Sequence, residues 1–297
     1  MFEEGLLDNY TDEQLLQYFQ QSPFLITTRN ESVRILSPGL IVKPYPSFLD
    51  YSDELSALEL AHTRGVRVPG VRRVVRSVEN GNHLLIMDRI HGLTLEQLWP
   101  NLGWWDTFRV AWQLRSFLCI MRSITSQTTG GLHTGITRSE WLQDVYGPTL
   151  HASPSAFSGY VNWWLLECRP SWCKPRPELM LEPAPEHIFV HQDLAPRNMI
   201  LDDAGKLWVV DWGHAGFYPA YMEYMGLETT SMPWINAPTW AAWWARMRWS
   251  FFRWIAAGPV GPHKKPRHAL FVVYERSIRY RLDKTPYSRV EDEVFPQ

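Results

Sequence analysis

The hydrophobic positions in the first ninety residues alternate between helical and extended spacing. Thr11 and Gln14 form the pattern of a capping box, in which two side chains satisfy backbone amides at the start of a helix, and apolar residues follow at helical spacing. A second helical phase covers residues 50–62. Extended runs separated by turn-forming residues are predicted at 24–28, 33–36, 40–43, 71–78 and 83–88. This pattern predicts a small sheet with one helix inserted in it.

Beyond Gly92 the apolar positions recur mostly at helical spacing. Thr94 is placed to cap a short helix that runs to Leu98, and longer helices are predicted at 104–125, 156–167, 236–256 and 265–283. Irregular segments rich in Gly, Pro, Ser or Thr separate them, and short apolar runs alternate with turns over 187–212. A β-rich front and a helical back predict an α+β fold with two lobes, a small one over residues 1–90 and a larger helical one over residues 91–297.

Composition and charge narrow the class of protein. The hydrophobic share of 45% is ordinary for a globular chain, and the formal net charge of −2 argues against a general nucleic-acid binder, which normally carries a basic excess. The most apolar stretch, 238–260, contains Arg246, Arg248 and Arg253, which argue against a membrane span. We therefore expect neither nucleic acid nor a membrane as a partner.

Cysteine use and the first residues indicate the compartment. Cys119, Cys168 and Cys173 are odd in number and lack C-x-x-C spacing, a pattern that favours reduced thiols over a disulfide framework. The opening MFEEGLLDNYTDEQ is acidic and polar, unlike a signal or transit peptide. These features predict a cytoplasmic protein.

One segment carries a pattern that suits phosphoryl transfer. His191-x-Asp193-x4-Asn198 is followed by two short apolar runs around a turn at Gly205, and Asp211 ends the second run. Transfer of a phosphoryl group needs a carboxylate beside the attacking hydroxyl and oxygen ligands for the magnesium that bridges the nucleotide phosphates. Asp and Asn in loops usually serve turns, but the combination with a His and with a second Asp after an apolar strand is much rarer. The spacing therefore favours a catalytic loop.

This segment resembles the aminoglycoside phosphotransferase-like family, which has the two-lobed protein-kinase-like fold, and especially its fungal-type branch. The similar motifs are His191-Gln-Asp-Leu-Ala-Pro-Arg-Asn198 and Val210-Asp-Trp-Gly-His-Ala-Gly-Phe-Tyr-Pro219, followed by Glu223. The resemblance covers roughly residues 28–228. It implies Asp193 as the catalytic base, Asn198 and Asp211 as magnesium ligands, and His191 as a support of the loop. Two positions depart from the family pattern: Gln192 replaces a usual Gly or Arg, and Gly213 replaces a common acid.

The resemblance also implies a nucleotide-binding role for the N-terminal lobe. Lys43 ends the apolar run 40–42, and the family pattern assigns such a lysine to the nucleotide phosphates. Glu54 on the following helix is the first candidate to orient this lysine, with Glu59 and Asp53 as alternatives because an error of one helical turn would exchange them.

Two further segments correspond to nucleotide-binding parts of the family. Residues 30–33 match the turn that covers the phosphates, with Asn30 and Ser32 as candidate ligands, although no Gly-x-Gly-x-x-Gly pattern is present. Residues 85–92 resemble the hinge, in which backbone groups from Asp88 to Ile90 would receive adenine. From the residues alone this segment is only an inner strand that ends at a Gly turn.

We therefore predict an ATP- and Mg²⁺-dependent phosphotransferase that acts on a hydroxyl group of a small molecule. The alternative is a nucleotide-binding but non-catalytic relative that acts as a regulatory or binding module, which the presence of Lys43, Asp193, Asn198 and Asp211 disfavours. A protein kinase is disfavoured because neither Asp-Phe-Gly nor Ala-Pro-Glu occurs. Aminoglycosides, choline, fructosamine and other hydroxylated metabolites remain open as acceptors.

Sixteen tryptophans are unusual for a chain of 297 residues, and a group of them falls near the C-terminal end. Aromatic residues and one methionine recur there at spacings of three and four: Trp240, Trp243, Trp244, Met247, Phe251 and Trp254. This stripe predicts core packing in the helical lobe, with some of the rings available to line an acceptor pocket.

Overall fold

The computed structural model describes residues 2–25, 33–46, 48–76, 83–139, 141–142, 148–168, 173–228, 239–259 and 263–279. The chain divides into two compact units. Unit 1 comprises Met1–Gly103 and Pro196–Gly213, and unit 2 comprises Trp104–Ala195 and His214–Gln297. The chain therefore returns to the N-terminal unit for a short segment before it completes the second one. The lobe boundary expected at residues 90 and 91 stays a prediction.

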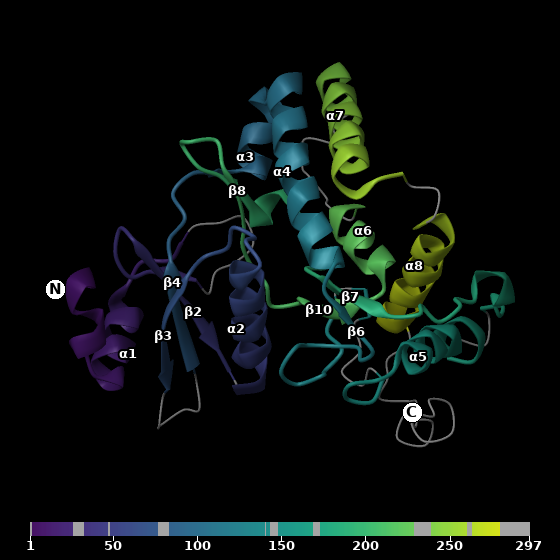
Figure 1. Cartoon of the computed structure of the whole chain (residues 1–297), viewed down its shortest axis with the longest axis horizontal. Coiled ribbons are helices and arrows are strands. Elements are labelled where there is room, and N and C mark those ends of the chain that lie inside the picture. The colour runs from purple at the N-terminus through teal and green to yellow at the C-terminus, as the bar shows by residue number, and fades with distance from the viewer. Residues whose placement is uncertain are drawn as a thin grey trace. The chain divides into compact units, whose positions relative to one another are not determined.

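Unit 1 is built on an antiparallel sheet with the strand order β1-β2-β4-β3. Helices α1 and α2 flank this sheet in Figure 1, and α1 begins at the predicted capping box of Thr11 and Gln14. The elements of this part are η1 (Glu4–Asn9), α1 (Asp12–Gln21), β1 (Arg34–Ile35), β2 (Leu40–Tyr45), α2 (Phe48–Thr63), β3 (Val71–Arg76) and β4 (His83–Asp88).

Alternation along β2 decides which side chains reach each face of this sheet. Leu40 and Val42 point to one face, where they join a buried cluster with Leu15 of α1. Because successive side chains of a strand point to opposite faces, Lys43 and Tyr45 lie on the other face, which α2 covers. The lysine is thus turned away from the apolar cluster.

A second, three-stranded sheet of unit 1 has the order β5-β8-β9. Residues of the hairpin β8–β9 bond to Arg67, whose carbonyl accepts from Val209 N at 3.0 Å and whose Nε donates to the carbonyl of Leu207 at 2.9 Å. These bonds fasten the hairpin to the N-terminal unit. Its elements are β5 (Leu93–Thr94), α3 (Leu95–Leu98), η2 (Trp99–Asn101), η4 (Pro196–Asn198), β8 (Met199–Leu201) and β9 (Leu207–Val209).

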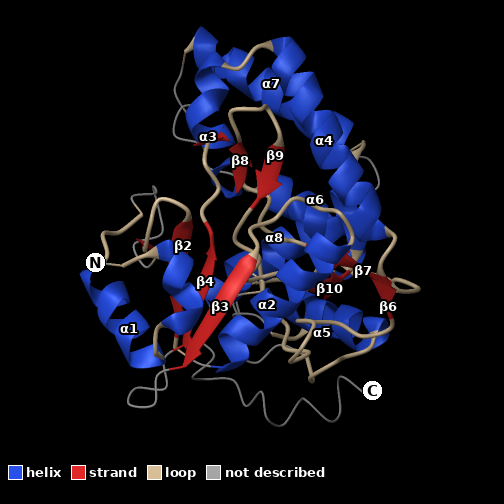
Figure 2. Ribbon diagram, turned by 60° about the vertical axis from the view of Figure 1, so that its left-hand side comes forward, coloured by secondary structure: helices blue, strands red, loops and turns tan. Residues whose placement is uncertain are grey.

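Unit 2 is mainly helical and holds a small antiparallel sheet with the order β10-β7-β6. Its large apolar cluster joins α5 to α8, and Arg276 of α8 donates to the carbonyls of Trp164 and Lys174. Figure 2 shows its helices in blue. The elements are α4 (Trp104–Arg122), β6 (Thr125–Ser126), α5 (Pro154–Leu166), η3 (Pro177–Leu179), β7 (His187–Val190), β10 (Gly216–Tyr218), α6 (Ala220–Glu228), α7 (Trp240–Ala257) and α8 (Lys264–Arg279).

Most of the predicted elements within the described residues are confirmed. The cap at Thr94, the long helix from Trp104 and the two strands after Asn198 are present. Helix α6 and strands β6 and β10 were not predicted, because they are short and become regular through tertiary pairing. The turn expected at 79–82 and the strand end expected at 26–28 lie outside the described residues.

The prediction that the aromatic stripe of α7 packs the core is wrong. Five of its six members are exposed, with Trp240 at 78% and Trp254 at 58%. The buried side of α7 is formed instead by small and aromatic residues on the opposite face. Periodic spacing defines a face of a helix but does not say which of two apolar faces the fold covers. The buried residues are Ala242, Ala245, Trp249, Phe252, Ile255, Ala256 and Ala257.

Two general expectations concern disulfides and membrane helices. Cys119, Cys168 and Cys173 form no disulfide, and all three belong to the described part of the chain. Within the same part, no helix combines the length and the hydropathy that crossing a bilayer requires.

We expect the glycine before β5 to be required for the fold. Gly92 has φ +149°, and a Cβ added there would lie 2.3 Å from the carbonyl oxygen of Leu201. Gly65 also has a positive φ, +88°, but an added Cβ would meet nothing within 4 Å. Gly65→Ala should cost about 1 kcal/mol of backbone strain, and Gly92→Ala about 3 kcal/mol because the strand pair must also move. Urea unfolding measures both, and equal losses would contradict the close approach.

Candidate active site

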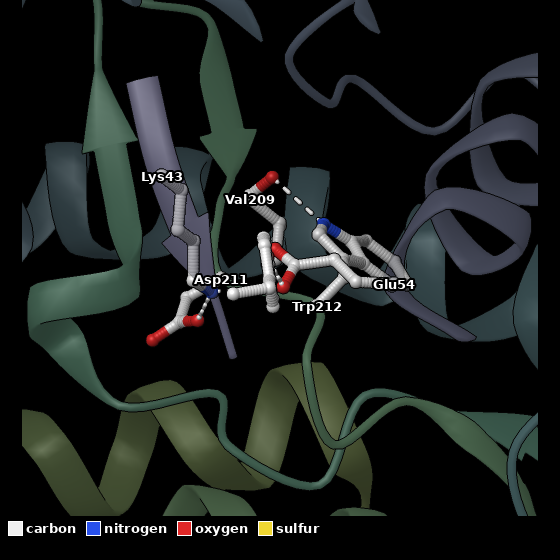
Figure 3. A network of polar contacts seen from close by, with 6 residues as sticks. Lys43, Glu54, Val209, Asp211 and Trp212 are labelled. Carbon is white, nitrogen blue, oxygen red and sulfur yellow. Dashed lines mark hydrogen bonds and ion pairs between the residues drawn. The ribbon is translucent and has the colours of Figure 1, made fainter. Parts of the chain in front are cut away.

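The first unit gathers three charged side chains from distant parts of the sequence. Lys43 Nζ donates to Glu54 Oε2 at 2.8 Å and to Asp211 Oδ1 at 2.6 Å (Figure 3). β2 supplies the lysine, α2 the glutamate and the segment after β9 the aspartate. Of the three acids considered for Lys43, Glu54 makes the contact, whereas Glu59 is exposed.

Tyr45 is a member of this group that the sequence reasoning missed. Its hydroxyl donates to Glu54 Oε2, the same oxygen that binds Lys43. The lysine ammonium also lies 5.4 Å from the centroid of the Tyr45 ring. Residues two apart in a strand share a face, so the alternation around Lys43 was the available signal.

The charges in this group stabilise one another. Burial disfavours the charged ammonium, but the carboxylates of Glu54 and Asp211 outweigh this and raise the pKa of Lys43 well above its usual value. Burial, followed by the adjacent charge of Glu54, raises the pKa of Tyr45 well above its usual value. The lysine is therefore a fixed positive charge and the tyrosine a neutral hydrogen-bond donor at neutral pH.

Asp211 is held in a backbone conformation that few residues adopt. Its φ is 66°, in the left-handed region, where Asp is tolerated better than most residues. The turn is fixed by Trp212, whose Nε1 donates to the carbonyl of Val209 at 3.0 Å (Figure 3). The Asp211 side chain keeps 38% of its surface exposed. One carboxylate thus both pairs with Lys43 and remains accessible from outside.

Gly213, which departs from the family pattern, lies directly against this group. A Cβ added at Gly213 would be 3.3 Å from Glu54 Oε2 and 3.8 Å from Lys43 Nζ. An acidic residue here would therefore start beside an existing carboxylate. The glycine leaves the Lys43–Glu54 contact without a competing side chain.

Asn198 and Asp211 offer the kind of oxygen ligands that magnesium requires. The amide of Val210 donates to the Asn198 carbonyl at 2.9 Å, so Asn198 and Asp211 start from neighbouring backbone positions in the same unit. Asn198 is buried and Asp211 is partly exposed. A carboxylate and a carboxamide fit Mg²⁺, which binds one or two such protein groups and keeps substrate phosphates and water as its other ligands. The described residues contain no cluster of three His, Cys, Asp or Glu suited to a metal.

Asp193 belongs to the second unit, where a hydrogen bond to Glu223 anchors its loop. The Glu223 Oε2 accepts from the backbone amide of His191 at 2.7 Å, and the His191 Nδ1 accepts from the amide of Asp193 at 3.2 Å. All three residues are buried. The imidazole therefore contacts the backbone of the loop, as expected for a supporting residue. Glu223 is part of the sequence motif that resembles the family, but the sequence alone assigned it no role.

Gln192 ties the same loop to two other segments of the second unit. Its Nε2 donates to the carbonyl of Arg138 at 2.9 Å and to that of His214 at 2.7 Å. Its φ is 68°, which a usual Gly would adopt without strain. Gly226 leaves room for the carbonyl of Gln192, because a Cβ added at Gly226 would lie 2.3 Å from the Gln192 carbonyl oxygen. Gln192 thus adopts a backbone conformation that is more strained for Gln than for Gly, but its side chain adds two hydrogen bonds.

Burial changes the titration of two acid–base groups near this loop. Desolvation raises the pKa of Glu223 to about 7, although the hydrogen bond from His191 acts in the opposite direction. Desolvation lowers the pKa of His187 to about 4, and its Nδ1 lies 3.1 Å from the Thr129 hydroxyl. Glu223 is thus close to half-protonated at neutral pH, whereas His187 is neutral.

The expected nucleotide-binding segments of the first unit are only partly described. The N–H of Asp88 donates to the Gly70 carbonyl at 2.9 Å, and the N–H of Arg89 donates to the Gly39 carbonyl at 2.8 Å. These two N–H groups are already engaged, so adenine held by the segment from Asp88 to Ile90 would bind backbone groups other than the N–H of Asp88 and of Arg89. The Asp88 side chain pairs with Arg72 at 2.6 Å. Asn30 and Ser32 lie outside the described residues.

We predict that Glu223 makes the protein less stable as the pH rises through neutrality. Its folded pKa of about 7 lies above the usual 4.5, so its contribution is complete below pH 4.5 and is lost as the pH passes 7. At about 1.4 kcal/mol per unit, the loss approaches about 3 kcal/mol. Glu223→Gln cannot titrate and should show a flatter dependence of the free energy of unfolding in urea from pH 5 to 8. Parallel curves for the two proteins would contradict the shift.

Comparison with known proteins begins from the sequence. A model of the phosphotransferase enzyme family (APH) matches residues 21–235, a range that contains the whole ion group and the Asp193 loop. A search of curated proteins finds no match.

Solved structures with a similar fold include aminoglycoside phosphotransferases. The chain is similar to APH(3'')-Id from Streptomyces rimosus ATCC10970, with 15% identity, 90% of this chain and 98% of that chain covered, and a TM-score of 0.52. It is also similar to a thermostable mutant of APH(4)-Ia in its apo form, with 16% identity, coverage of 92% and 91%, and a TM-score of 0.53. A ternary complex of a thermostable APH(4)-Ia mutant with AMP-PNP and hygromycin B gives 17% identity, coverage of 91% and 90%, and a TM-score of 0.53.

At such identities the likeness concerns the fold, and it confirms the predicted α+β, protein-kinase-like fold class. The family model adds the enzyme class, and it covers well over half of the sequence. The chain therefore belongs to the phosphotransferase enzyme family.

Proposed function

We propose that this protein transfers a phosphoryl group from ATP to a hydroxyl group of a small molecule, with Mg²⁺ as cofactor and Asp193 as the catalytic base. The observation that carries the proposal is the contact of Lys43 with Glu54 and Asp211. A lysine fixed by a glutamate beside a metal-binding aspartate is the arrangement that holds nucleotide phosphates in kinases.

The ligands of structurally similar proteins support the two substrates. The APH(4)-Ia mutant with a TM-score of 0.53 was solved with AMP-PNP and hygromycin B, a nucleotide analogue and a small molecule. For this protein we infer only the two classes of substrate, ATP and a hydroxylated small molecule. Asn30, Ser32 and the backbone from Asp88 to Ile90 are proposed to contact the nucleotide, as the sequence resemblance implies.

Each residue of the site has a distinct task in the proposed reaction. Lys43 binds nucleotide phosphate oxygens, and Glu54 keeps its ammonium oriented. Asn198 and Asp211 would hold the Mg²⁺, which would supply positive charge against the negative charge that develops during transfer. Asp193 accepts the proton of the acceptor hydroxyl as that oxygen attacks the γ-phosphorus. His191, Gln192 and Glu223 keep the loop of Asp193 in its conformation.

Two finer statements belong to the same proposal. The motifs His191–Asn198 and Val210–Pro219, with Glu223 after them, favour the fungal-type branch of the family. A cytoplasmic location agrees with three cysteines that form no disulfide and with the need of the reaction for cellular ATP.

Replacing the lysine tests the nucleotide site directly. Lys43→Met keeps most of the length of the side chain but removes its charge, so we expect the Kd for MgATP to rise at least about tenfold, as for loss of a charge-assisted contact. Lys206→Met, at an exposed position, is the matched control and should bind like wild type. Calorimetric titration measures both, and circular dichroism verifies that the variants are folded. An unchanged affinity in folded Lys43→Met would assign the phosphates to another residue.

Replacing the base separates an enzyme from a binding module. Asp193→Asn keeps size and removes the proton acceptor, so MgATP binding should persist while turnover falls by about 10²- to 10⁴-fold. Release of ADP in the presence of a panel of hydroxylated metabolites, aminoglycosides and choline included, provides the assay. A wild type that binds MgATP but turns over with no acceptor, and an Asp193→Asn variant that behaves identically, would favour the non-catalytic module.

A further inference from the structure

Helices α4 and α7 of unit 2 lie side by side (Figures 1 and 2). Together they expose a set of large aromatic side chains and one methionine. The set is called the tryptophan face below. Each exposed member has between 38% and 78% of its surface accessible, and Phe251 is partly buried. Its members are Trp104, Trp105, Phe108 and Trp112 of α4 and Trp240, Trp243, Trp244, Met247, Phe251 and Trp254 of α7.

Ring contacts join members of this face into two groups, one that bridges α4 and α7 and one that runs along α4. The Trp104 ring lies 6.3 Å from the ring of Trp244 and 5.4 Å from that of Phe251, which joins the two helices. Along α4, successive rings stack at 5.9 and 6.0 Å from Trp105 through Phe108 to Trp112. The aromatic residues therefore hold one another in place while they remain open to solvent.

The tryptophan face is not a displaced part of the core. The other sides of both helices already pack against each other and bury Val110, Leu114, Trp249 and Phe252. Arg115 of α4 also donates to the carbonyl of Ile255 at 3.0 Å. Since the internal sides are occupied, the exposed aromatic residues are additional to what the fold requires. An apolar surface of this extent marks a binding site.

The charge of the two helices differs from that of the whole chain. Residues 104–122 and 240–257 contain six arginines and one aspartate, a net charge of +5, whereas the whole chain has −2. At 3.6 residues per turn, Arg246 and Arg253 follow one edge of the aromatic stripe of α7 and Arg248 follows the other. Arg115 and Arg122 of α4 donate to carbonyls of α7, and Arg109 pairs with Asp106. The basic residues along the two edges of the α7 stripe are therefore Arg246, Arg248 and Arg253.

We propose that the tryptophan face docks on an anionic lipid surface. Indole rings favour the boundary between headgroups and acyl chains because they combine an apolar body with a polar N–H. Arginines beside them bind lipid phosphates and carboxylates, the pattern of helices that lie in a membrane interface. A second copy of the same face would bring the arginines that border the α7 stripe close to the same arginines of its partner, so self-association is disfavoured. Docking in the headgroup layer needs no spanning helix, and it differs from the sequence-based expectation of no membrane partner.

Flotation of the purified full chain with vesicles tests the proposal. Vesicles of phosphatidylcholine with about one-third phosphatidylserine should carry the protein upward, and phosphatidylcholine alone should carry much less. High ionic strength should weaken the binding without abolishing it, because salt screens the arginines but not the indoles. Amides of α4 and α7 should gain protection from hydrogen exchange on the anionic vesicles.

Matched variants separate the two contributions. Trp240→Ser/Trp243→Ser/Trp254→Ser changes only exposed positions and should lower the partition coefficient on anionic vesicles at least about tenfold. Phe271→Ser, an exposed aromatic of α8 outside the face, should bind like wild type. Arg246→Glu/Arg253→Glu should remove the preference for phosphatidylserine, whereas Lys265→Glu on α8 should keep it.

Three results would overturn the proposal. One is the absence of wild-type flotation at every lipid ratio, and another is equal flotation of wild type and the triple tryptophan variant. The third is a concentration-dependent dimer in sedimentation that the triple variant abolishes, together with no lipid binding, which would assign the face to a second copy of the chain. Since none of these measurements uses turnover, they stand independently of the proposed phosphoryl transfer.

Discussion

The ammonium of Lys43, whose side chain keeps only 14% of its surface exposed, is the constraint around which the first unit is organised. A charge removed from water needs opposite charge and hydrogen bonds, and loss of one partner in such a pair typically costs about 3–5 kcal/mol. Glu54 and Asp211 supply that charge from α2 and from the segment after β9. Their positions in turn require the fastening of the β8–β9 hairpin to Arg67 and the left-handed turn at Asp211. Electrostatics therefore links a strand, a helix and a hairpin that are far apart in sequence.

The loop of Asp193 is stabilised by a different principle. It uses backbone hydrogen bonds to Glu223 and to the Gln192 side chain instead of ion pairs. Desolvation raises the pKa of the Glu223 carboxyl to about 7, so part of the population is neutral at neutral pH while Oε2 accepts the hydrogen bond from His191. Gln192 adds a positive φ, which persists only where surrounding bonds over-determine the conformation. A rigid loop of this kind suits the role of catalytic base that we propose for Asp193, which needs one fixed geometry.

Helix α7 has two apolar faces with similar residue spacing, of which one is buried and the other is exposed. Both faces contain tryptophan and other apolar residues at helical spacing, yet one is buried against α4 and the other is exposed. The buried face includes Ala242 and Ala245, whose small side chains allow the helices to approach closely. The exposed face consists of bulky rings bordered by arginine, which pack poorly between helices and suit a boundary between apolar and polar surroundings.

The sequence by itself predicted most of the elements and the enzyme class of the chain. The capping box at Thr11 and the apolar spacing of α4 depend on residues that are close together in the sequence. The Asp193–Asn198 motif can likewise be recognised from the sequence because it lies within one short segment. The sequence also narrowed the partner of Lys43 to three acids on one helix. The tertiary structure confirmed the contact of Glu54, the first candidate, with Lys43. Only the tertiary structure added Tyr45 and brought Asp211 to the same ammonium. It alone decided that the aromatic stripe of α7 faces outward. The reason is physical: periodicity records what a residue can bury within its own element, whereas pairing across 168 residues depends on how separate elements pack.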